Sequence, residues 1–116
     1  MQAIQQHATA VKPGIFIDWH SYSELNLYPW GDTKDKAADF AGFDALAKKF
    51  SSWNGYTPQQ SIQLYPPSGT SKDWMYGTHK IPGFTIETGR TFHQNDAEFE
   101  RVWGENAPIF SYVAKI

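Results

Sequence analysis

The segment IFIDWHSYS, residues 15–23, constrains the fold more than any other part of this chain. Gly14 precedes it, and a short apolar run rich in β-branched and aromatic residues predicts a buried strand. The strand ends at His20, which is followed by small hydroxyl residues. Because α/β sheets place their chemistry just past the carboxyl ends of strands, His20 is a candidate metal ligand. The alternative is a histidine that only hydrogen-bonds across a loop.

Composition indicates a single globular domain at most and excludes several classes of protein. The chain has 116 residues, of which 41% are hydrophobic and 19% charged, as in globular proteins. A net charge of −2 and the lack of a basic stripe predict no nucleic-acid partner. No apolar run approaches the roughly 20 residues of a membrane span, and no signal peptide is visible. Since the chain has no cysteine, any zinc site must use histidine and carboxylate ligands.

Apolar residues at helical spacing predict three helices. The first covers residues 2–12, and Met1 starts directly into it, so we expect the chain to begin inside an element that starts elsewhere. The second runs over Thr33–Phe50, has an aromatic stripe that we expect in the core, and is stopped by Asn54-Gly55. The third begins with Asp96 as its cap, and Pro108 is expected to kink or restart it.

Four strands are expected between these helices, over Ile15–His20, Leu25–Tyr28, Ser61–Tyr65 and Phe84–Glu87. A proline-rich loop follows the third, and a short helical turn is expected around residues 73–76. The alternation of helices and strands favours an α/β fold, in which helices cover a mostly parallel or mixed sheet of about four strands.

Three motifs, in one order and with compatible separations, resemble the zinc carboxypeptidases related to carboxypeptidases A and B. HSYS at residues 20–23, followed by LYPWG at 27–31, resembles the family's third-ligand motif. YPPSGTSKDW at 65–74 resembles its mobile tyrosine loop, and FTIE at 84–87 resembles the strand that presents its catalytic glutamate. The resemblance covers essentially the whole chain but only the C-terminal part of the family's catalytic domain.

The resemblance implies an incomplete α/β/α sandwich over residues 1–116 that takes part in zinc-dependent hydrolysis of C-terminal peptide bonds. It implies that His20 is a zinc ligand, that Glu87 is the general base, and that Tyr65 swings over bound substrate. It also implies substrate contacts for residues beside these positions, Ser21, Tyr22 and Thr85. The alternatives without a catalytic role are that Glu87 is a surface carboxylate and that Tyr65 is an ordinary half-buried aromatic residue.

Lys72 is the residue that gives the most information about substrate specificity. By the loop resemblance it occupies the position at the base of the pocket for the substrate's terminal side chain. A lysine there would favour Asp or Glu at the C-terminus of the peptide through charge pairing. The alternative is that Lys72 turns outward and is solvated, as most lysines are.

The chain lacks the His-x-x-Glu motif that supplies the family's first two zinc ligands, and the family's substrate arginines also lie upstream of anything in it. One histidine cannot hold catalytic zinc, which takes about three protein ligands, so we expect the isolated chain to be inactive. Three hypotheses follow: the C-terminal segment of a peptidase, a truncated module that binds peptides or proteins without catalysis, or an unrelated α/β domain. An uncovered sheet edge predicts self-association, and the resemblance favours a secreted or periplasmic location.

Overall fold

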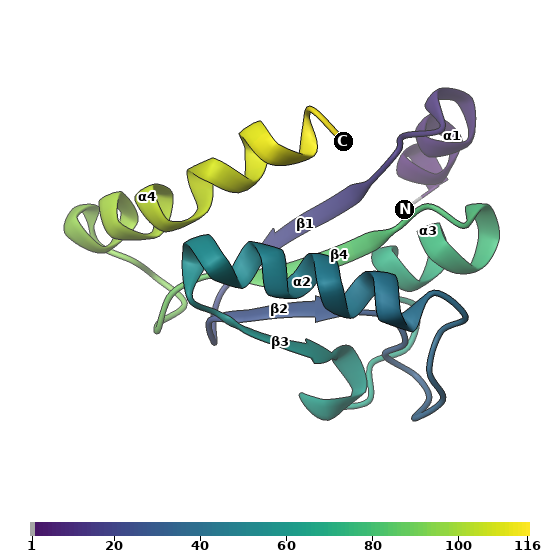
Figure 1. Ribbon diagram of the computed structural model, residues 1–116, viewed down its shortest axis with the longest axis horizontal. Coiled ribbons are helices and arrows are strands. Elements are labelled where there is room, and N and C mark those ends of the chain that lie inside the picture. Colours follow the sequence, from purple (N-terminus) through teal and green to yellow (C-terminus); the bar gives the residue numbers. More distant parts are fainter. Residues whose placement is uncertain (1) are drawn as a thin grey trace.

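Four strands form one mixed sheet in the order β1-β4-β2-β3 in the computed structural model, which describes residues 2–116. They are β1 (Phe16–His20), β2 (Leu25–Tyr28), β3 (Thr57–Gln60) and β4 (Gly83–Glu87). β1 pairs parallel with β4, whereas β2 pairs antiparallel with β4 and parallel with β3. The carboxyl ends of β1 and β4 therefore meet at the same end of the sheet (Figure 1).

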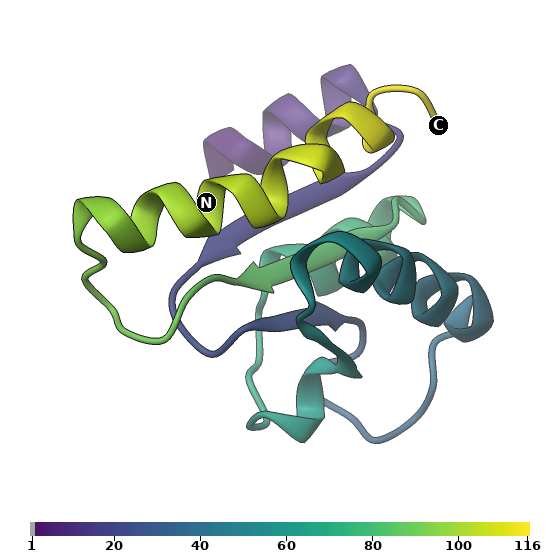
Figure 2. The same ribbon diagram turned by 60° about the vertical axis from the view of Figure 1, so that its left-hand side comes forward.

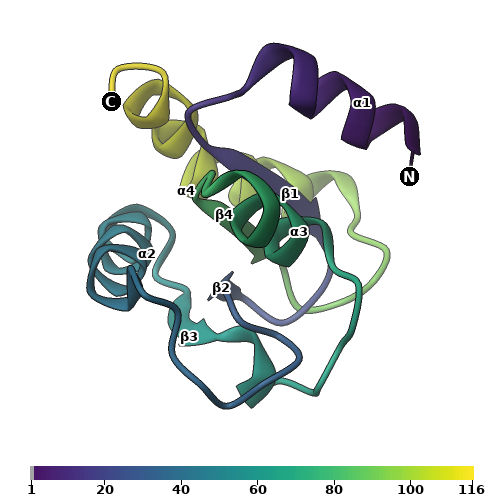
Figure 3. The same cartoon turned by 90° about the vertical axis from the view of Figure 1, so that its right-hand side faces the viewer.

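Four α-helices cover the sheet: α1 (Gln2–Val11), α2 (Phe40–Asn54), α3 (Ser71–His79) and α4 (Asp96–Val113). Figure 3 shows α2 and α4 on one side of the sheet and α3 on the other, and Figure 2 shows α4 running along β1. This arrangement confirms the predicted α/β/α sandwich with a mixed four-stranded sheet. None of the helices between residues 2 and 116 combines the length and apolar character needed to cross a membrane.

Alternation along the parallel strands β1 and β4 separates the core from the polar face of the sheet. Successive side chains of a strand point to opposite faces. The side chains packed with α2 and α4 are apolar, and those on the opposite face, at the carboxyl ends, are polar. The first set comprises Ile17, Trp19, Phe84 and Ile86, and the second comprises Asp18, His20, Thr85 and Glu87.

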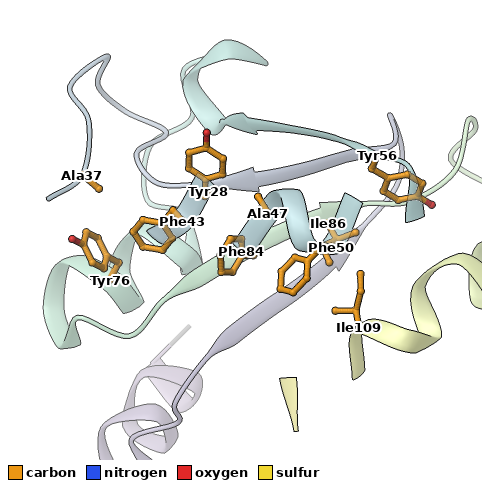
Figure 4. Close-up of a cluster of buried hydrophobic side chains, with 10 residues drawn as sticks. All are labelled: Tyr28, Ala37, Phe43, Ala47, Phe50, Tyr56, Tyr76, Phe84, Ile86 and Ile109. Atoms are coloured by element: carbon orange, nitrogen blue, oxygen red, sulfur yellow. The ribbon is translucent and has the colours of Figure 1, made fainter. Parts of the chain in front are cut away.

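Aromatic rings fill the space between α2 and the sheet (Figure 4). The ring centroids of Phe50 and Phe84 lie 5.2 Å apart in an edge-to-face arrangement, and those of Phe43 and Phe84 lie 5.7 Å apart. Phe50 and Phe84 have no exposed surface, and burying each ring contributes about 1.5–3 kcal/mol. Phe43 and Phe50 thus lie in the core, as the aromatic stripe of this segment predicts.

The second helix begins later than the sequence predicts. It starts at Phe40 instead of Thr33 and continues past Phe50 to Asn54, where Gly55 in a left-handed conformation ends it. Tertiary contacts hold the residues before it in a loop, because the Gln60 side-chain amide donates to three backbone carbonyl groups there, those of Trp30, Thr33 and Asp35.

One further prediction was wrong in position, and another was right in kind but too short. The strand expected over Ser61–Tyr65 is absent, because the residues that pair with β2 are Thr57–Gln60, and Ser61–Gln63 form a 3-10 helix. The observed strand, β3, lies at the edge of the sheet, where its proline is tolerated. The short turn around residues 73–76 is part of the longer helix α3.

The last helix also differs from its prediction, at its N-terminal cap and at Pro108. Asn95, and not Asp96, caps it, since the Asn95 side chain accepts a hydrogen bond from the Glu98 amide at 2.9 Å. The helix continues through Pro108 without a break. Its last turns are held by tertiary packing, because Ile109 is fully buried and Phe110 stacks on Trp19 at 5.0 Å.

Buried amides join β2, α2 and α4 at the centre of the apolar core. The Asn54 side chain donates to the Oδ1 atoms of Asn26 and Asn106, both at 3.0 Å. Its own Oδ1 accepts from the backbone amide of Tyr56 at 2.9 Å. Each of these groups would cost free energy if it were buried without a partner.

We therefore expect Asn54→Ala to lower the free energy of unfolding by about 1–3 kcal/mol. The substitution leaves the Oδ1 atoms of Asn26 and Asn106 and the backbone amide of Tyr56 without their partner. Urea denaturation would measure the change. Ser52→Ala is the matched control on the same helix, since its exposed hydroxyl bonds only to the Lys49 carbonyl. A control variant that loses as much stability as Asn54→Ala would contradict this role of the buried amides.

Candidate active site

The carboxyl ends of β1 and β4 place His20 and Glu87 next to each other in register. Both line a cavity of about 160 Å³ that opens between the sheet, the start of α3 and the loop before it. Tyr65, Lys72 and Thr85 line the same cavity. Residues from distant parts of the chain therefore meet at one site, as expected for the carboxyl end of parallel strands.

Glu87 is a largely buried carboxylate, with 9% of its surface exposed. Burial raises the pKa of its carboxyl group, and the neighbouring charge of His20 lowers it. Asp18 also raises this pKa, and Lys72 lowers it. A carboxyl group with a raised pKa in a cavity suits a general base that must accept a proton near neutral pH.

The backbone of His20 is fixed while its ring is open to solvent. Its carbonyl oxygen accepts hydrogen bonds from the amide and hydroxyl of Thr88, at 2.8 and 2.9 Å. The side chain is 56% exposed, and its Nε2 lies 3.7 Å from a carboxylate oxygen of Asp18. A ring anchored at its base and open at its tip is geometrically suited to ligate a metal.

The residues of this chain do not make a zinc site by themselves. Within residues 2–116, no group of three or more histidine, aspartate and glutamate side chains is placed to hold a metal ion. A catalytic zinc takes about three protein ligands, and His20 offers one. His20 alone therefore does not complete such a site among residues 2–116.

Lys72 is buried, with 2% of its surface exposed, and does not turn outward. Its Nζ donates to the Thr70 hydroxyl at 3.2 Å and lies 3.9 Å from Asp73 Oδ1. Burial lowers the pKa of its amine, and the charges of Asp73, Asp18 and Glu87 raise it. α3 approaches the sheet closely at this point, because a Cβ atom on Gly83 would lie 2.8 Å from the Lys72 backbone.

The other predicted substrate contacts lie in and beside this cavity. Thr85 is 7% exposed and lines it, and Tyr65 lies at its rim with 59% of its surface exposed. Ser21 and Tyr22 lie in an adjoining hollow that also reaches Tyr65 and Glu87. They pack on Phe92, whose carbonyl oxygen accepts from the Ser21 hydroxyl at 3.1 Å and whose ring meets Tyr22 edge to face at 4.7 Å.

Sequence reasoning missed three polar residues of the site: Asp18, Ser71 and Asp73. Asp18 accepts from the Ser71 hydroxyl at 3.1 Å, and Asp73 accepts from the Gly31 amide at 2.8 Å, which ties the start of α3 to the loop after β2. Strand periodicity could have identified Asp18, because residues two apart lie on the same face of a strand and His20 was already a candidate. No comparable pattern marks Ser71 or Asp73.

Comparison with known proteins agrees with this geometry. A model of the zinc carboxypeptidase family matches residues 1–109. The chain belongs to the zinc carboxypeptidase family. Among relatives, a zinc carboxypeptidase of Saccharothrix mutabilis subsp. capreolus is 43% identical over 77 residues, which are 61% of this chain and 18% of that protein. Carboxypeptidase A4 of Mus musculus is 38% identical over 79 residues, 62% of this chain and 19% of that protein.

Carboxypeptidase B of Astacus astacus is 33% identical over 92 residues, 72% of this chain. The chain thus spans 18–30% of the length of these three zinc carboxypeptidase relatives. Among solved structures, bovine thrombin-activatable fibrinolysis inhibitor in complex with tick carboxypeptidase inhibitor superposes with a TM-score of 0.81 at 20% identity. That superposition covers 98% of this chain and 45% of the other, and it shows that the fold is shared.

We expect the 116-residue chain to bind zinc weakly, because His20 has no neighbouring ligand set within residues 2–116. Calorimetric titration of the chain with zinc, alongside the variant His20→Ala, would measure this. His79→Ala is a suitable control, since His79 lies at the far end of α3. Tight, stoichiometric binding that disappears in His20→Ala would contradict the expectation and would mean that other side chains complete the site.

Proposed function

We propose that this chain forms part of the active site of a zinc metallocarboxypeptidase that removes C-terminal residues from peptides or proteins. Residues 1–116 would be the C-terminal segment of its catalytic domain. The observation that supports this most is the register that places His20 and Glu87 together beside a cavity in a chain of this family. Zinc would be the cofactor, with His20 as one ligand and the others from outside the chain.

In this proposal Glu87 is the general base that takes a proton from the attacking water and passes it to the leaving amine. Its buried position and raised pKa suit both steps, because the group must hold a proton and then release it. Tyr65 covers bound substrate from the rim of the cavity and helps exclude water. Ser21, Tyr22 and Thr85 contact the peptide. The isolated chain would lack activity, since substrate and metal would both need further residues.

Lys72 would give the enzyme a preference for acidic C-terminal residues. Its ammonium group lies on the wall of a partly closed cavity, where charge pairing is stronger than in water. An acidic side chain entering this cavity would approach Lys72, whereas a basic side chain would be repelled. From the family resemblance, we propose that the enzyme is secreted or periplasmic.

A second candidate function is a non-catalytic module that binds peptides or another protein. One observation favours it, which is the absence of a three-ligand metal group within residues 2–116. The two functions differ in whether Glu87 matters for turnover or only for binding, and the next experiment separates them.

Glu87→Gln should remove nearly all turnover while leaving substrate binding largely intact. Loss of a general base costs about two to four decades in rate, roughly 3–5 kcal/mol. The assay would use a chimera in which this chain replaces the matching segment of the Saccharothrix mutabilis relative, with kcat and KM measured separately. Tyr65→Phe is the comparison variant and should lose much less. A folded, zinc-loaded chimera without activity, or an active Glu87→Gln variant, would contradict the proposed role.

Lys72→Asp should shift preference from acidic towards basic C-terminal residues, because the new charge repels the old substrate and attracts its opposite. The measurement is kcat/KM of the same chimera on matched peptides that end in Glu, Leu or Lys. Lys80→Asp is the control, since Lys80 lies at the opposite end of α3 from the cavity. An unchanged order of substrates in Lys72→Asp would remove the specificity proposal and leave the family assignment intact.

The isolated chain should also self-associate through the free edge of β1, which is the terminal strand of the sheet within residues 2–116. Unpaired strand edges promote association with other chains. Light scattering over a range of concentrations would measure it, with Ile17→Pro as the variant that removes a backbone donor from this strand. A monodisperse monomer at all concentrations would count against this expectation.

A further inference from the structure

Asp18 is a carboxylate in the cavity for which the mechanism above has no use. It lies on β1 two residues before His20 and pairs in register with Thr85. It lines the same cavity as Lys72 and Glu87. Its side chain is 19% exposed, so it is largely shielded from solvent.

One oxygen of Asp18 is engaged and the other is not. Oδ2 accepts from the Ser71 hydroxyl at 3.1 Å and lies 3.7 Å from His20 Nε2. Oδ1 is buried and has no hydrogen-bond partner among residues 2–116. Buried carboxylate oxygens are normally paired, so this oxygen is a hydrogen-bond acceptor that residues 2–116 leave unsatisfied.

Lys72 provides the complementary group. Its ammonium has three donors, and its only hydrogen bond to residues 2–116 is to the Thr70 hydroxyl. Asp18 lines the same cavity as Lys72 and accepts a hydrogen bond from Ser71, the residue before Lys72. The cavity therefore presents a donor and an acceptor together, and its positive charge is partly compensated by Asp18.

An uncharged amide group complements the pair formed by Lys72 and Asp18, although Lys72 alone would favour a carboxylate. Its carbonyl oxygen can accept from Lys72 while its NH2 group donates to Asp18. A carboxylate gains more from Lys72 but has no proton to donate and is repelled by Asp18. A purely apolar side chain leaves both groups unpaired, which is costly in a buried site.

Resting on the peptide-binding pocket proposed above, we propose that Asp18 is a second specificity-determining residue of this cavity. It moderates the charge preference set by Lys72, so that the cavity accepts the amide side chains of Gln and Asn alongside Glu and Asp. The substrate class is thus peptides whose last side chain carries a carbonyl oxygen, charged or neutral.

The test measures kcat/KM of the chimera described above, in which this chain replaces the matching segment of the Saccharothrix mutabilis relative, on matched peptides that end in Gln, Glu or Leu. The values for the Gln and Glu peptides should lie within about threefold of each other, and the value for the Leu peptide should be lower. Asp18→Asn removes the charge and keeps an acceptor for Ser71, so it should raise the Glu-to-Gln ratio of kcat/KM about tenfold. Asp18→Ser is a second uncharged variant and should change the ratio in the same direction.

Ser71→Ala is the matched control, because it removes the hydrogen bond to Asp18 and leaves the charge. The Glu-to-Gln ratio should stay unchanged in it. An equal change in Ser71→Ala and Asp18→Asn would assign Asp18 a purely structural role and overturn the inference. An unchanged ratio in both Asp18 variants would overturn the inference while the pocket stands, and a folded, zinc-loaded chimera that cleaves none of the peptides would overturn the proposed function together with the inference.

Discussion

The parallel pairing of β1 with β4 is the interaction on which the rest of the site depends. Its register aligns Asp18 with Thr85 and His20 with Glu87, so four polar side chains lie on one face of the sheet. The same register sends the intervening side chains into the core beneath α2 and α4. Core packing and site geometry are therefore two results of one strand pairing, and neither can change alone, because a shift of one residue would exchange the two faces.

The buried charge of Lys72 is balanced by nearby carboxylates more than by direct ion pairs. Lys72 is almost fully buried beside three carboxylates, yet its nearest carboxylate oxygen, on Asp73, lies 3.9 Å away. Burial of such a group disfavours its charged form, and the nearby negative charges favour it. A cavity of this kind holds polar groups that are not fully satisfied by the chain, which is a feature of binding sites more than of cores.

Sequence reasoning was most successful where short-range pattern and tertiary structure agree. The strands that end at His20 and Glu87 lie where apolar runs predict them, although β4 is fully buried and β1 only half-buried, with His20 exposed. The strand expected at Ser61–Tyr65 was wrong, because its alternation was accidental and pairing with β2 selected other residues. The late start of α2 depends on long-range hydrogen bonds from Gln60, which no local pattern contains. Asp18 was missed because charge alone does not mark function, although its spacing from His20 placed it on the same face.

The position of β1 at the edge of the sheet has a consequence for assembly. Within this chain His20 is carried by the strand with support on one side only, whereas Glu87 lies on a strand with neighbours on both sides. The histidine is thus the less firmly placed of the two. Whatever pairs with the open side of β1 would stiffen it and fix the direction of the imidazole. Occupation of the open edge and orientation of the candidate metal ligand would then be one event.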